Sequence, residues 1–376
     1  MKIILISPSP PLRGGISDHN IGLYNKLSEK HDVEIFSFNY LYPKFFFPGK
    51  SQTFSNKDKF KNTHYTISSI NPISWIKTSN KIKKMNPDVV IFSFWNPFIG
   101  LSLGSIAKLL ARKINKKKII SICHNIKPHE PSWFDKKLVK FYTNSFDKFI
   151  FMSSFVENEL NEFKNKFKSV IRFLPIDIQY KSSYNKIKIA KEMGFTSKDR
   201  IILFTGLIRP YKGVDNLLLG TKTFLKKNKN HKLIIAGEAY EDTEKYKSII
   251  SKNGIEDKVI WIDKFLAHSE IEKLMIISDV LILPYKSASQ SGIVSKAWEY
   301  NLPIIANNVG GFSECIVNGK SGYIIENNSI TSLEEKVNIY FNSNDKNEMT
   351  KFILSNKHKF SWEYYISGIW ELINES

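Results

Sequence analysis

Short uninterrupted apolar runs, separated by stretches long enough for a helix, limit most strongly how this chain folds. The runs lack the polar alternation of a strand with one wet face, so we predict parallel strands covered by helices on both faces. Strands that alternate with helices predict α/β doubly wound sheets. The runs form two series, at 3–6, 33–38, 89–94, 118–123 and 148–152, and at 201–205, 232–236, 259–262, 280–284 and 304–306.

Two series of strands predict two Rossmann-like domains, and 376 residues are enough for both cores. Pro175 and the polar run at 181–186, which precedes a predicted helix at 187–193, indicate where the domains join. The final segment has an amphipathic pattern rich in aromatic residues, so we expect a helix that packs back on the first domain. The expected parts are an amino-terminal domain, a carboxy-terminal domain and the returning helix, over 1–180, 181–359 and 360–376.

The positive charge of the chain is concentrated in its first half. Residues 1–180 hold 28 Lys+Arg and 13 Asp+Glu, a net +15. The rest of the chain holds 27 and 23, a net +4, which together give the total of +19. This asymmetry favours an anionic partner for the first domain, such as a phospholipid surface. The alternative is that Lys is simply the default surface residue, and no recognition module supports a nucleic-acid partner.

Cysteine content and hydropathy predict a cytoplasmic protein. Only Cys123 and Cys315 are present, too few for a disulfide framework. No run of 18 apolar residues predicts a membrane-spanning helix. The first six residues are typical of a strand rather than of a signal peptide.

A double glycine follows the first predicted strand. Gly14 and Gly15 let the backbone approach a ligand, and the helix that follows favours an anion or a polar sugar at its amino end. An ordinary strand-to-helix turn is the alternative. His19, in that helix, is a candidate acceptor-binding residue.

Two cations follow the first strand of the second half. Arg209 and Lys212 lie on either side of Pro210, in a turn that begins at Gly206 and leads into a helix at 214–220. Two cations beside a helix amino end suit a diphosphate leaving group. The alternative is a pair of solvated surface charges.

A second turn, at residues 287–292 within the stretch 286–303, carries no charge. It follows the strand at 280–284 and leads into a predicted helix. Its neutral side chains offer donors and acceptors for sugar hydroxyls, and the start of the helix can meet phosphates. The residues assigned to this donor site are Ser289, Gln290, Ser291, Gly292 and Ile293.

Several polar residues follow strands of the first domain. Trp95 and Asn96 offer an aromatic platform and an amide for a sugar acceptor, although core packing of Trp95 is the alternative. His129 and Glu130 form a possible acid/base pair, or else a loop that caps the next helix. The aromatic loop at 40–49 packs on the domain or, given the charge, contacts a membrane interface.

The blocks at 206–215 and 303–314 resemble the diphosphate-binding segment and the segment after the donor-binding helix of retaining glycosyltransferases of family 4. The turn at 318–325 is similar to that family as well. Weaker matches follow in the same order, at Gly14-Gly15, Pro87-Asp88, His124-Asn125 and the helix that starts with 360–363. The resemblance implies the GT-B fold, in which two Rossmann-like domains face a cleft.

Carried over to this chain, the resemblance implies that Arg209 and Lys212 bind the donor diphosphate. It implies that His124, at a strand end, faces the donor sugar near the anomeric carbon. The family's two motif glutamates are absent: Ala288 and Lys296 occupy their positions. Glu299 is the nearest carboxylate that could reach a ribose, or it pairs with Lys296 instead. The chain resembles a subgroup with a Ser-Ala-Ser-Gln-Ser-Gly turn.

We therefore expect a retaining glycosyltransferase that moves a hexose from a UDP- or GDP-linked sugar to a glycan or lipid-linked acceptor in bacterial surface polysaccharide or lipopolysaccharide synthesis. Such an enzyme needs no metal or other cofactor if Arg209 and Lys212 supply the positive charge. It is expected in the cytoplasm, either free or peripheral on the inner membrane face. The alternative is a catalytically silent relative that binds sugar nucleotides or membranes.

Overall fold

Contacts within the chain divide it into two α/β units. The first is Met1–Pro175 with Trp362–Ser376, and the second is Ile176–Ser361. The computed structural model describes residues 1–43, 53, 59–115, 118–128, 132–177, 185–289, 291–343 and 345–374. The predicted domain boundary at 180/181 lies outside these residues. None of the helices in them is long and apolar enough to span a bilayer.

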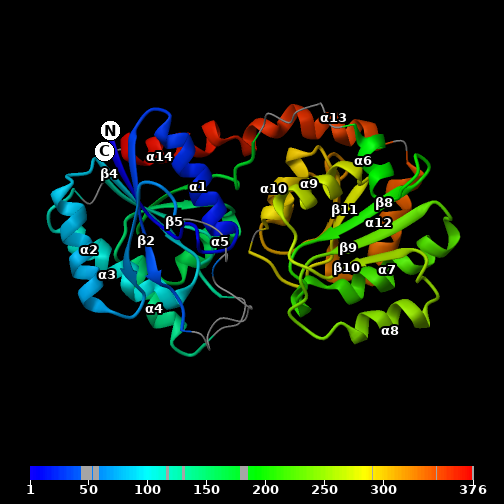
Figure 1. Cartoon of the computed structure of the whole chain (residues 1–376), viewed down its shortest axis with the longest axis horizontal. Coiled ribbons are helices and arrows are strands. Elements are labelled where there is room, and N and C mark those ends of the chain that lie inside the picture. Colours follow the sequence, from blue (N-terminus) through cyan, green and yellow to red (C-terminus); the bar gives the residue numbers. More distant parts are fainter. Residues whose placement is uncertain are drawn as a thin grey trace. The chain divides into compact units, whose positions relative to one another are not determined.

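The first unit is built on a seven-stranded parallel sheet, with the order β3-β2-β1-β4-β5-β6-β7 (Figure 1). Each strand pairs in parallel, as when Ile3 of β1 lies opposite Val33 on one side and Val89 on the other. The strands are β1 (Lys2–Ile6), β2 (Asp32–Tyr40), β3 (Thr63–Ser68), β4 (Val89–Phe94), β5 (Ile119–Cys123), β6 (Lys148–Phe151) and β7 (Lys168–Ile171).

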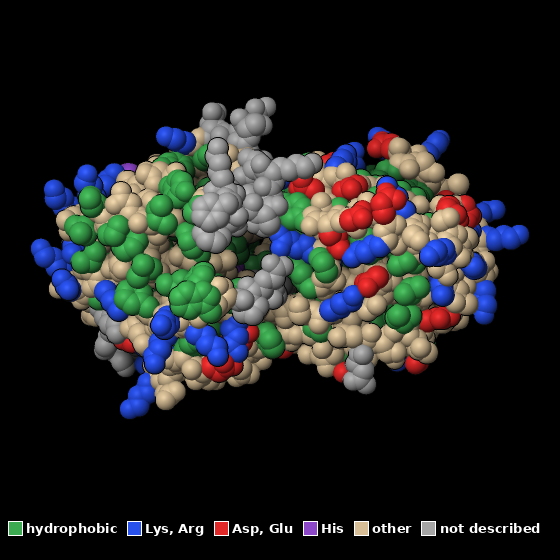
Figure 2. Space-filling view, turned by 90° about the horizontal axis from the view of Figure 1, so that it is seen from below, with side chains coloured by type: hydrophobic (Ala, Val, Ile, Leu, Met, Phe, Trp, Pro, Cys, Tyr) green, Lys and Arg blue, Asp and Glu red, His purple; other side chains and the backbone are tan. Residues whose placement is uncertain are grey.

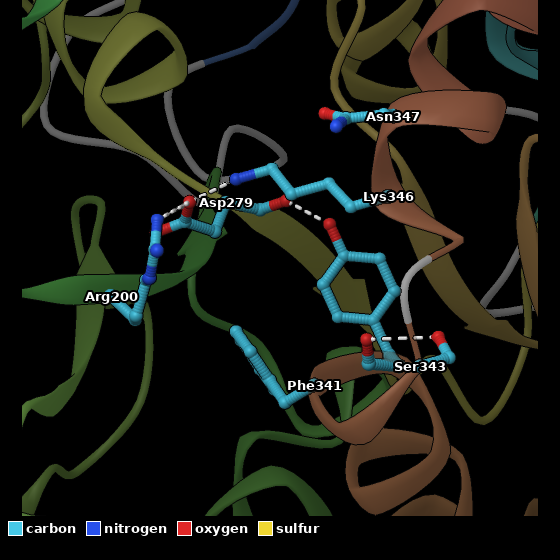
Figure 3. Close-up of a pocket in the computed structure, with 7 residues that line it drawn as sticks. Arg200, Asp279, Phe341, Ser343, Lys346 and Asn347 are labelled. Carbon is cyan, nitrogen blue, oxygen red and sulfur yellow. Dashed lines mark hydrogen bonds and ion pairs between the residues drawn. The ribbon is translucent and has the colours of Figure 1, made fainter.

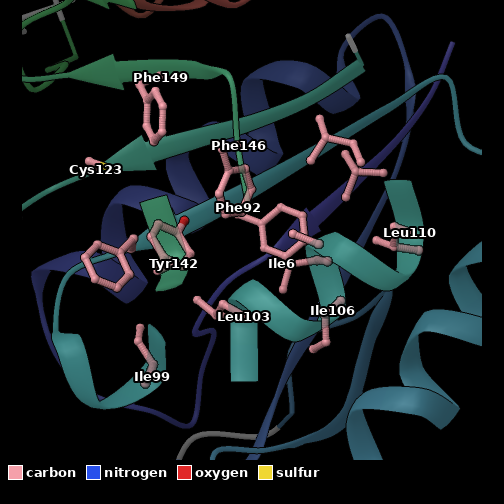
Figure 4. Packing of buried hydrophobic residues seen from close by; sticks show 14 of the residues in the cluster. Ile6, Phe92, Ile99, Leu103, Ile106, Leu110, Cys123, Tyr142, Phe146 and Phe149 are labelled. Atoms are coloured by element: carbon pink, nitrogen blue, oxygen red, sulfur yellow. The ribbon is translucent and has the colours of Figure 1, made fainter. Parts of the chain in front are cut away.

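Helices cover both faces of this sheet, because successive strand residues point to opposite sides. In β4, Val89 and Ile91 join the core under α1 and α14. Val90, Phe92 and Phe94 join the core under α2, α3 and α4, part of which Figure 4 shows. The helices are α1 (Gly15–Ser28), α2 (Pro72–Lys84), η2 (Pro97–Ile99), α3 (Gly100–Ala111), α4 (Asp135–Thr143), α5 (Ser154–Asn161) and α14 (Trp362–Asn374).

The aromatic helix predicted at 360–376 is α14, and its predicted return to the first unit is confirmed. Its residues Tyr365, Ile369 and Leu372 are buried in the core that β1, β4 and β5 share with α1. The ammonium of Lys148, which is itself buried, donates a hydrogen bond to the carbonyl of Leu372. The first unit is therefore built from two stretches of the sequence, one before and one after the second unit.

The second unit contains a six-stranded parallel sheet with the order β10-β9-β8-β11-β12-β13. Its strands are β8 (Arg200–Thr205), β9 (His231–Ala236), β10 (Val259–Ile262), β11 (Val280–Leu283), β12 (Ile304–Asn307) and β13 (Gly322–Ile325). Its helices are α6 (Lys186–Glu192), η4 (Pro210–Lys212), α7 (Val214–Lys227), α8 (Glu244–Lys252), α9 (His268–Ile277), α10 (Gly292–Glu299), α11 (Phe312–Cys315), η5 (Glu326–Asn328), α12 (Ile330–Asn342), α13 (Lys346–Asn356) and η6 (Lys357–Phe360). The predicted α/β class with two doubly wound sheets is confirmed.

Three strands were missing from the sequence prediction: β3, β7 and β13. Each lies at the edge of its sheet. An edge strand has a neighbour on one side only, and most residues of β3 are only partly buried. Such a strand does not need the continuous apolar run by which the central strands were recognised.

A buried carboxylate ties together the amino ends of β8 and β11. Asp279, just before β11, accepts a hydrogen bond from the amide of Ile201 at 2.7 Å. Lys346 of α13 is ion-paired with the same carboxylate, and Arg200 lies 3.6 Å from it (Figure 3). Lys186 lies 3.5 Å from it as well. Arg200, Asp279 and Lys346 border a pocket of about 370 Å³. The pocket lies at the amino ends of the strands, whereas ligands of such sheets bind at the carboxyl ends.

We predict that Asp279→Asn lowers the free energy of unfolding by about 2–4 kcal/mol, because a buried carboxylate and its ion pairs are lost. Burial works against ionisation, but Lys346, Lys186 and the Ile201 amide outweigh it and hold the pKa of Asp279 below its ordinary value. This contribution to stability is therefore present above pH 4 and lost as the pH falls further. Urea unfolding of both proteins at several pH values measures the difference.

Asp257→Asn is the matched control. Asp257 is 72% exposed and lies 3.5 Å from Lys258, so its loss should change stability by less than about 0.5 kcal/mol. Equal effects of the two substitutions would contradict the proposed contribution of Asp279.

Candidate functional site

The first-unit candidates lie at the carboxyl ends of three neighbouring strands. Gly14 and Gly15 follow β1, Trp95 and Asn96 follow β4, and His124 follows β5. In the sheet β1 is flanked by β2 and β4, so the chain continues in opposite directions from this point. Such a topological switch point is where open α/β sheets bind ligands.

The turn after β1 leaves open space beside the start of α1. Gly14 has φ 121°, a conformation that other residues rarely adopt. A side-chain carbon built at Gly14 or Gly15 would meet no atom within 4 Å. Both glycines are exposed, so this turn can accept a ligand next to the amino end of a helix.

His124 and His19 form a buried pair at the same edge. Their ring centroids are 5.1 Å apart in an edge-to-face arrangement. The backbone amide of His124 donates to the carbonyl of Phe94 at 2.8 Å, which fixes its position beside β4. Neither ring nitrogen of His124 has a hydrogen-bond partner among the described residues. A buried imidazole without partners can offer one donor and one acceptor to a ligand.

Both imidazoles are neutral at neutral pH. Burial lowers the pKa of His19 to about 4, with a smaller opposing effect from Asn20. Burial also lowers the pKa of His124 well below its ordinary value, and the proximity of His19 adds to this effect. A protonated ring here would lack the water that stabilises its charge. His124 is thus suited to hydrogen bonding rather than to carrying charge.

Two aromatic residues of α14 enclose His19, and the sequence analysis did not identify them as part of the site. The rings of Trp362 and His19 stack at 5.6 Å, and Tyr365 meets His19 edge-on at 5.1 Å. A side chain at Gly22 of α1 would come within 2.2 Å of the Trp362 ring. The returning helix therefore fixes α1, and with it His19, beside His124.

The remaining acceptor candidates have structural partners or lie outside the described residues. The indole N–H of Trp95 donates to the Tyr42 hydroxyl at 3.0 Å, and its ring packs on the core. The side-chain oxygen of Asn96 accepts from the Phe98 amide at 2.9 Å and caps η2. These contacts correspond to the core-packing alternative for Trp95. His129 and Glu130 lie outside the described residues, as do residues 44–49 of the aromatic loop.

The second-unit candidates also lie at a switch point, between β8 and β11. Arg209 precedes the short helix η4 and Lys212 ends it, at the carboxyl end of β8. The guanidinium of Arg209 lies 5.1 Å from the centre of the Tyr240 ring, and its Nε has no partner among the described residues. The structure thus brings the two predicted cations into one turn.

Lys212 is held by an aromatic residue that the sequence analysis did not name. Its ammonium donates to the hydroxyl of Tyr285 at 2.6 Å and lies 3.9 Å from the centre of that ring. Burial lowers the pKa of Lys212 to about 8; Tyr211 raises this pKa, and the positive charge of Arg209 lowers it further. Among the described residues no carboxylate is paired with this partly buried ammonium, so it gains from the arrival of an anion.

Two glycines allow the turns around this point to approach each other. Gly213 has φ 68°, and a side-chain carbon there would lie 2.0 Å from the carbonyl oxygen of Pro284. Gly310 has φ 54°, and a side-chain carbon there would lie 1.9 Å from the carbonyl oxygen of Ala288. The turns after β8 and β12 therefore press directly on the segment that follows β11.

The small-residue turn after β11 lies between these contacts. Ser289 is buried, and its carbonyl accepts from the Gly311 amide at 3.0 Å. Ser291 precedes α10, which begins at the exposed Gly292. A side-chain carbon built on Gly206 would lie 3.9 Å from Ile293, so the start of α10 adjoins the turn after β8. Gln290 lies outside the described residues.

The region where the resemblance implied a ribose contact holds an ion pair. The ammonium of Lys296 donates to the Glu299 carboxylate at 2.7 Å and lies 3.2 Å from His268 Nε2. The Glu299 side chain is 11% exposed, and its backbone carbonyl accepts from Lys357 at 2.7 Å. In this structure Glu299 is paired with Lys296, which was the alternative to a ribose contact.

Comparison with known proteins identifies relatives of both units. Residues 185–356 match the family described as Glycosyl transferases group 1. The chain is 24% identical over 386 residues to an uncharacterized glycosyltransferase of Methanocaldococcus jannaschii, covering 100% of this chain and 98% of that protein. It is 22% identical over 352 residues to N-acetyl-alpha-D-glucosaminyl L-malate synthase of Bacillus anthracis, covering 89% and 87%. The family match covers the second unit, and the two relatives extend the similarity to the first.

Solved structures share the fold over the full length. HepE of Anabaena, in complex with UDP, matches with a TM-score of 0.78 at 16% identity and 100% coverage of both chains. The lipopolysaccharide outer core galactosyltransferase WaaB matches with a TM-score of 0.73 at 17% identity, with 99% coverage of both. At these identities the likeness concerns the fold alone. The predicted GT-B pair of Rossmann-like domains is thereby confirmed.

We predict that Gly213→Ala lowers the free energy of unfolding by at least about 3 kcal/mol, because it combines an unfavourable φ with a clash against Pro284. Gly254→Ala is the matched control: Gly254 has φ 56° but no atom within 4 Å of an added carbon. The control should therefore cost only about 1–2 kcal/mol. Urea unfolding measures both. Equal losses of stability would contradict the prediction, because they would mean that the backbone at Pro284 shifts to accept the added carbon at little cost.

Proposed function

We propose that this glycosyltransferase, whose residues 185–356 match the family described as Glycosyl transferases group 1, transfers a hexose from a UDP- or GDP-linked sugar with retention of the anomeric configuration. The acceptor is a glycan or a lipid-linked sugar in bacterial surface polysaccharide or lipopolysaccharide synthesis. WaaB, a structural neighbour, is a lipopolysaccharide outer core galactosyltransferase, which supports this setting. The reaction takes place in the cytoplasm, where nucleotide sugars are made.

The observation that carries the proposal is the cationic turn after β8. Cleavage of a nucleotide sugar leaves a diphosphate whose negative charge develops in the transition state. Arg209 and Lys212 lie in the turn after β8, which adjoins the start of α10 where Gly206 approaches Ile293, and the amino end of this helix also favours an anion. Lys212 is poised for this role because burial penalises its charge until an anion arrives. Two cations of the chain itself thus stabilise the leaving group, and we propose that turnover needs no metal.

The sugar itself is held by neutral groups. Ser289, Gln290 and Ser291 supply donors and acceptors for hydroxyls in place of the missing motif carboxylate, while Gly292 and Ile293 bring the helix start to the phosphates. His124 donates to or accepts from a sugar hydroxyl as a neutral imidazole, consistent with its lowered pKa. Gly14 and Gly15 leave room for a ligand at the amino end of α1.

The Lys296–Glu299 pair favours a second candidate function. With the carboxylate engaged at 2.7 Å, the chain offers no free glutamate on this helix for a ribose. A sugar-nucleotide-binding relative without catalysis would show the same substitution. The release of UDP or GDP from a panel of nucleotide sugars separates the two candidates. Release with one donor and an α-linked product from an α-linked donor supports transfer with retention, whereas binding without release or transfer supports the silent relative.

We predict that Arg209→Ala and Lys212→Ala each reduce nucleotide release by about 10²–10³-fold, as expected when one group that stabilises transition-state charge is removed. Lys226→Ala, at the exposed end of α7, is the control and should keep full activity. Circular dichroism and thermal unfolding establish that each variant is folded. Near-normal turnover in both site variants would refute the diphosphate assignment.

The pH dependence gives a further test of Lys212. Its ammonium is present below pH 8 and is lost as the pH rises through about 8, so kcat/KM should fall there. A bound diphosphate favours the charged form, so the fall in kcat should lie at higher pH. Lys212→Arg should remove the fall at pH 8, because a guanidinium stays charged. An unchanged fall in that variant would assign it to another group.

A further inference from the structure

Helix α2 of the first unit exposes isoleucines on the face opposite the core. Trp75, Thr78, Ser79 and Ile82 are buried against the sheet. Ile73 is 61% exposed, and Ile76 and the preceding Ile70 are more than half exposed. The spacing of three residues places Ile73 and Ile76 on the same side of α2, and Ile70 lies just before the N-cap of this helix. A helix with a solvated outer face would carry polar residues there.

Two neighbouring helices add apolar residues at the same end. Leu101, in the first turn of α3, is 43% exposed, and Trp133, two residues before α4, is 84% exposed. Helices that follow parallel strands begin at the carboxyl edge of the sheet, so these side chains and Ile73 share that edge. Contacts join α2 to α3 and α3 to α4. Figure 2 shows exposed hydrophobic side chains gathered on this face of the first unit.

Cations accompany this apolar surface, and carboxylates are rare. Between residues 69 and 115 the sequence contains seven Lys+Arg and a single acidic residue, Asp88. Asp88 is engaged at the amino edge of the sheet, where it accepts a hydrogen bond from the Lys2 amide at 2.8 Å. On α2 itself, Lys77 and Lys84 are exposed alongside the isoleucines. The outer face of α2 therefore combines apolar and positive residues.

We propose that the outer surface formed by α2, the start of α3 and Trp133 docks on an anionic lipid bilayer. Ile70, Ile73, Ile76, Leu101 and Trp133 enter the boundary between headgroups and acyl chains, and lysines such as Lys77 and Lys84 meet the anionic headgroups. The docked edge is also the edge at which His124 follows β5, so a lipid-linked acceptor would be presented beside it.

The combination of features favours lipid over a protein partner. The side chains protrude singly from three elements, and lysines outnumber carboxylates beside them. Asp135, two residues after Trp133, accepts a hydrogen bond from the Ser132 amide at 2.6 Å, and the exposed Lys136 and Lys137 follow it. An indole with most of its surface free is typical of residues at a membrane interface. Neither hydrophobic insertion nor charge alone holds a protein stably on a bilayer, whereas the two together do.

Flotation with vesicles tests the proposal without reference to catalysis. The full chain should float with vesicles of phosphatidylcholine containing about 30 mol% phosphatidylglycerol, at about 0.1 M salt, and not with phosphatidylcholine alone. The variant Ile73→Ser/Ile76→Ser/Trp133→Ser should lower the partition coefficient by about tenfold or more. Lys77→Glu/Lys84→Glu should lower it by about tenfold or more as well, since each charge near the surface contributes about fivefold.

Matched controls come from the second unit. Leu354→Ser, at a leucine that is 59% exposed, and Lys226→Glu/Lys227→Glu, at exposed lysines of α7, should float like the unaltered chain. All variants alter exposed side chains, and an unchanged thermal unfolding curve checks that they fold. The proposal is overturned if the chain does not float, if the surface variants float like the controls, or if the surface variants instead abolish self-association that sedimentation detects in the unaltered chain.

Discussion

The cationic site of the second unit depends on two backbone contacts that a side chain would prevent. Gly213 lies against the carbonyl of Pro284, and Gly310 lies against the carbonyl of Ala288. Through these contacts the turns after β8 and β12 hold the segment after β11 from both sides. Tyr285, within that segment, can then bind the ammonium of Lys212. Without the close approach, the turn that carries the two cations would not meet the segment that leads into α10.

Burial leaves the histidines of the first unit uncharged at neutral pH but leaves Lys212 of the second unit charged. In the first unit, Trp362 and Tyr365 pack on His19, and His124 packs on His19. Burial keeps both imidazoles neutral, so they offer hydrogen bonds to hydroxyls without adding positive charge for a phosphate. In the second unit, burial lowers the pKa of Lys212 only to about 8, so the ammonium persists at neutral pH. This difference supports the proposal that His124 binds the sugar and Lys212 binds the diphosphate.

The sequence predicted the central strands and the positions of the cations, because continuous apolar runs and a turn with Arg209 and Lys212 are local patterns. It did not predict β3, β7 or β13, whose edge positions remove the need for such a run. Trp362, Tyr365 and Tyr285 were also not recognised as site residues. Their importance comes from tertiary contacts with His19 and Lys212, which no local spacing encodes. Trp95 shows the opposite case: its place at a strand end suggested a sugar contact, but its indole N–H donates to the Tyr42 hydroxyl.

The return of α14 to the first unit has a consequence for how the protein is made. On the ribosome, residues 1–175 emerge before the second unit, whereas Tyr365, Ile369 and Leu372, which cover one face of their sheet, emerge after it. The second unit is continuous in sequence and can complete its core before the first unit does. Until α14 arrives, Leu5, Ile91 and Ile122 of the first sheet lack part of their cover. Nascent chains stalled before residue 362 would therefore be the form most in need of a chaperone.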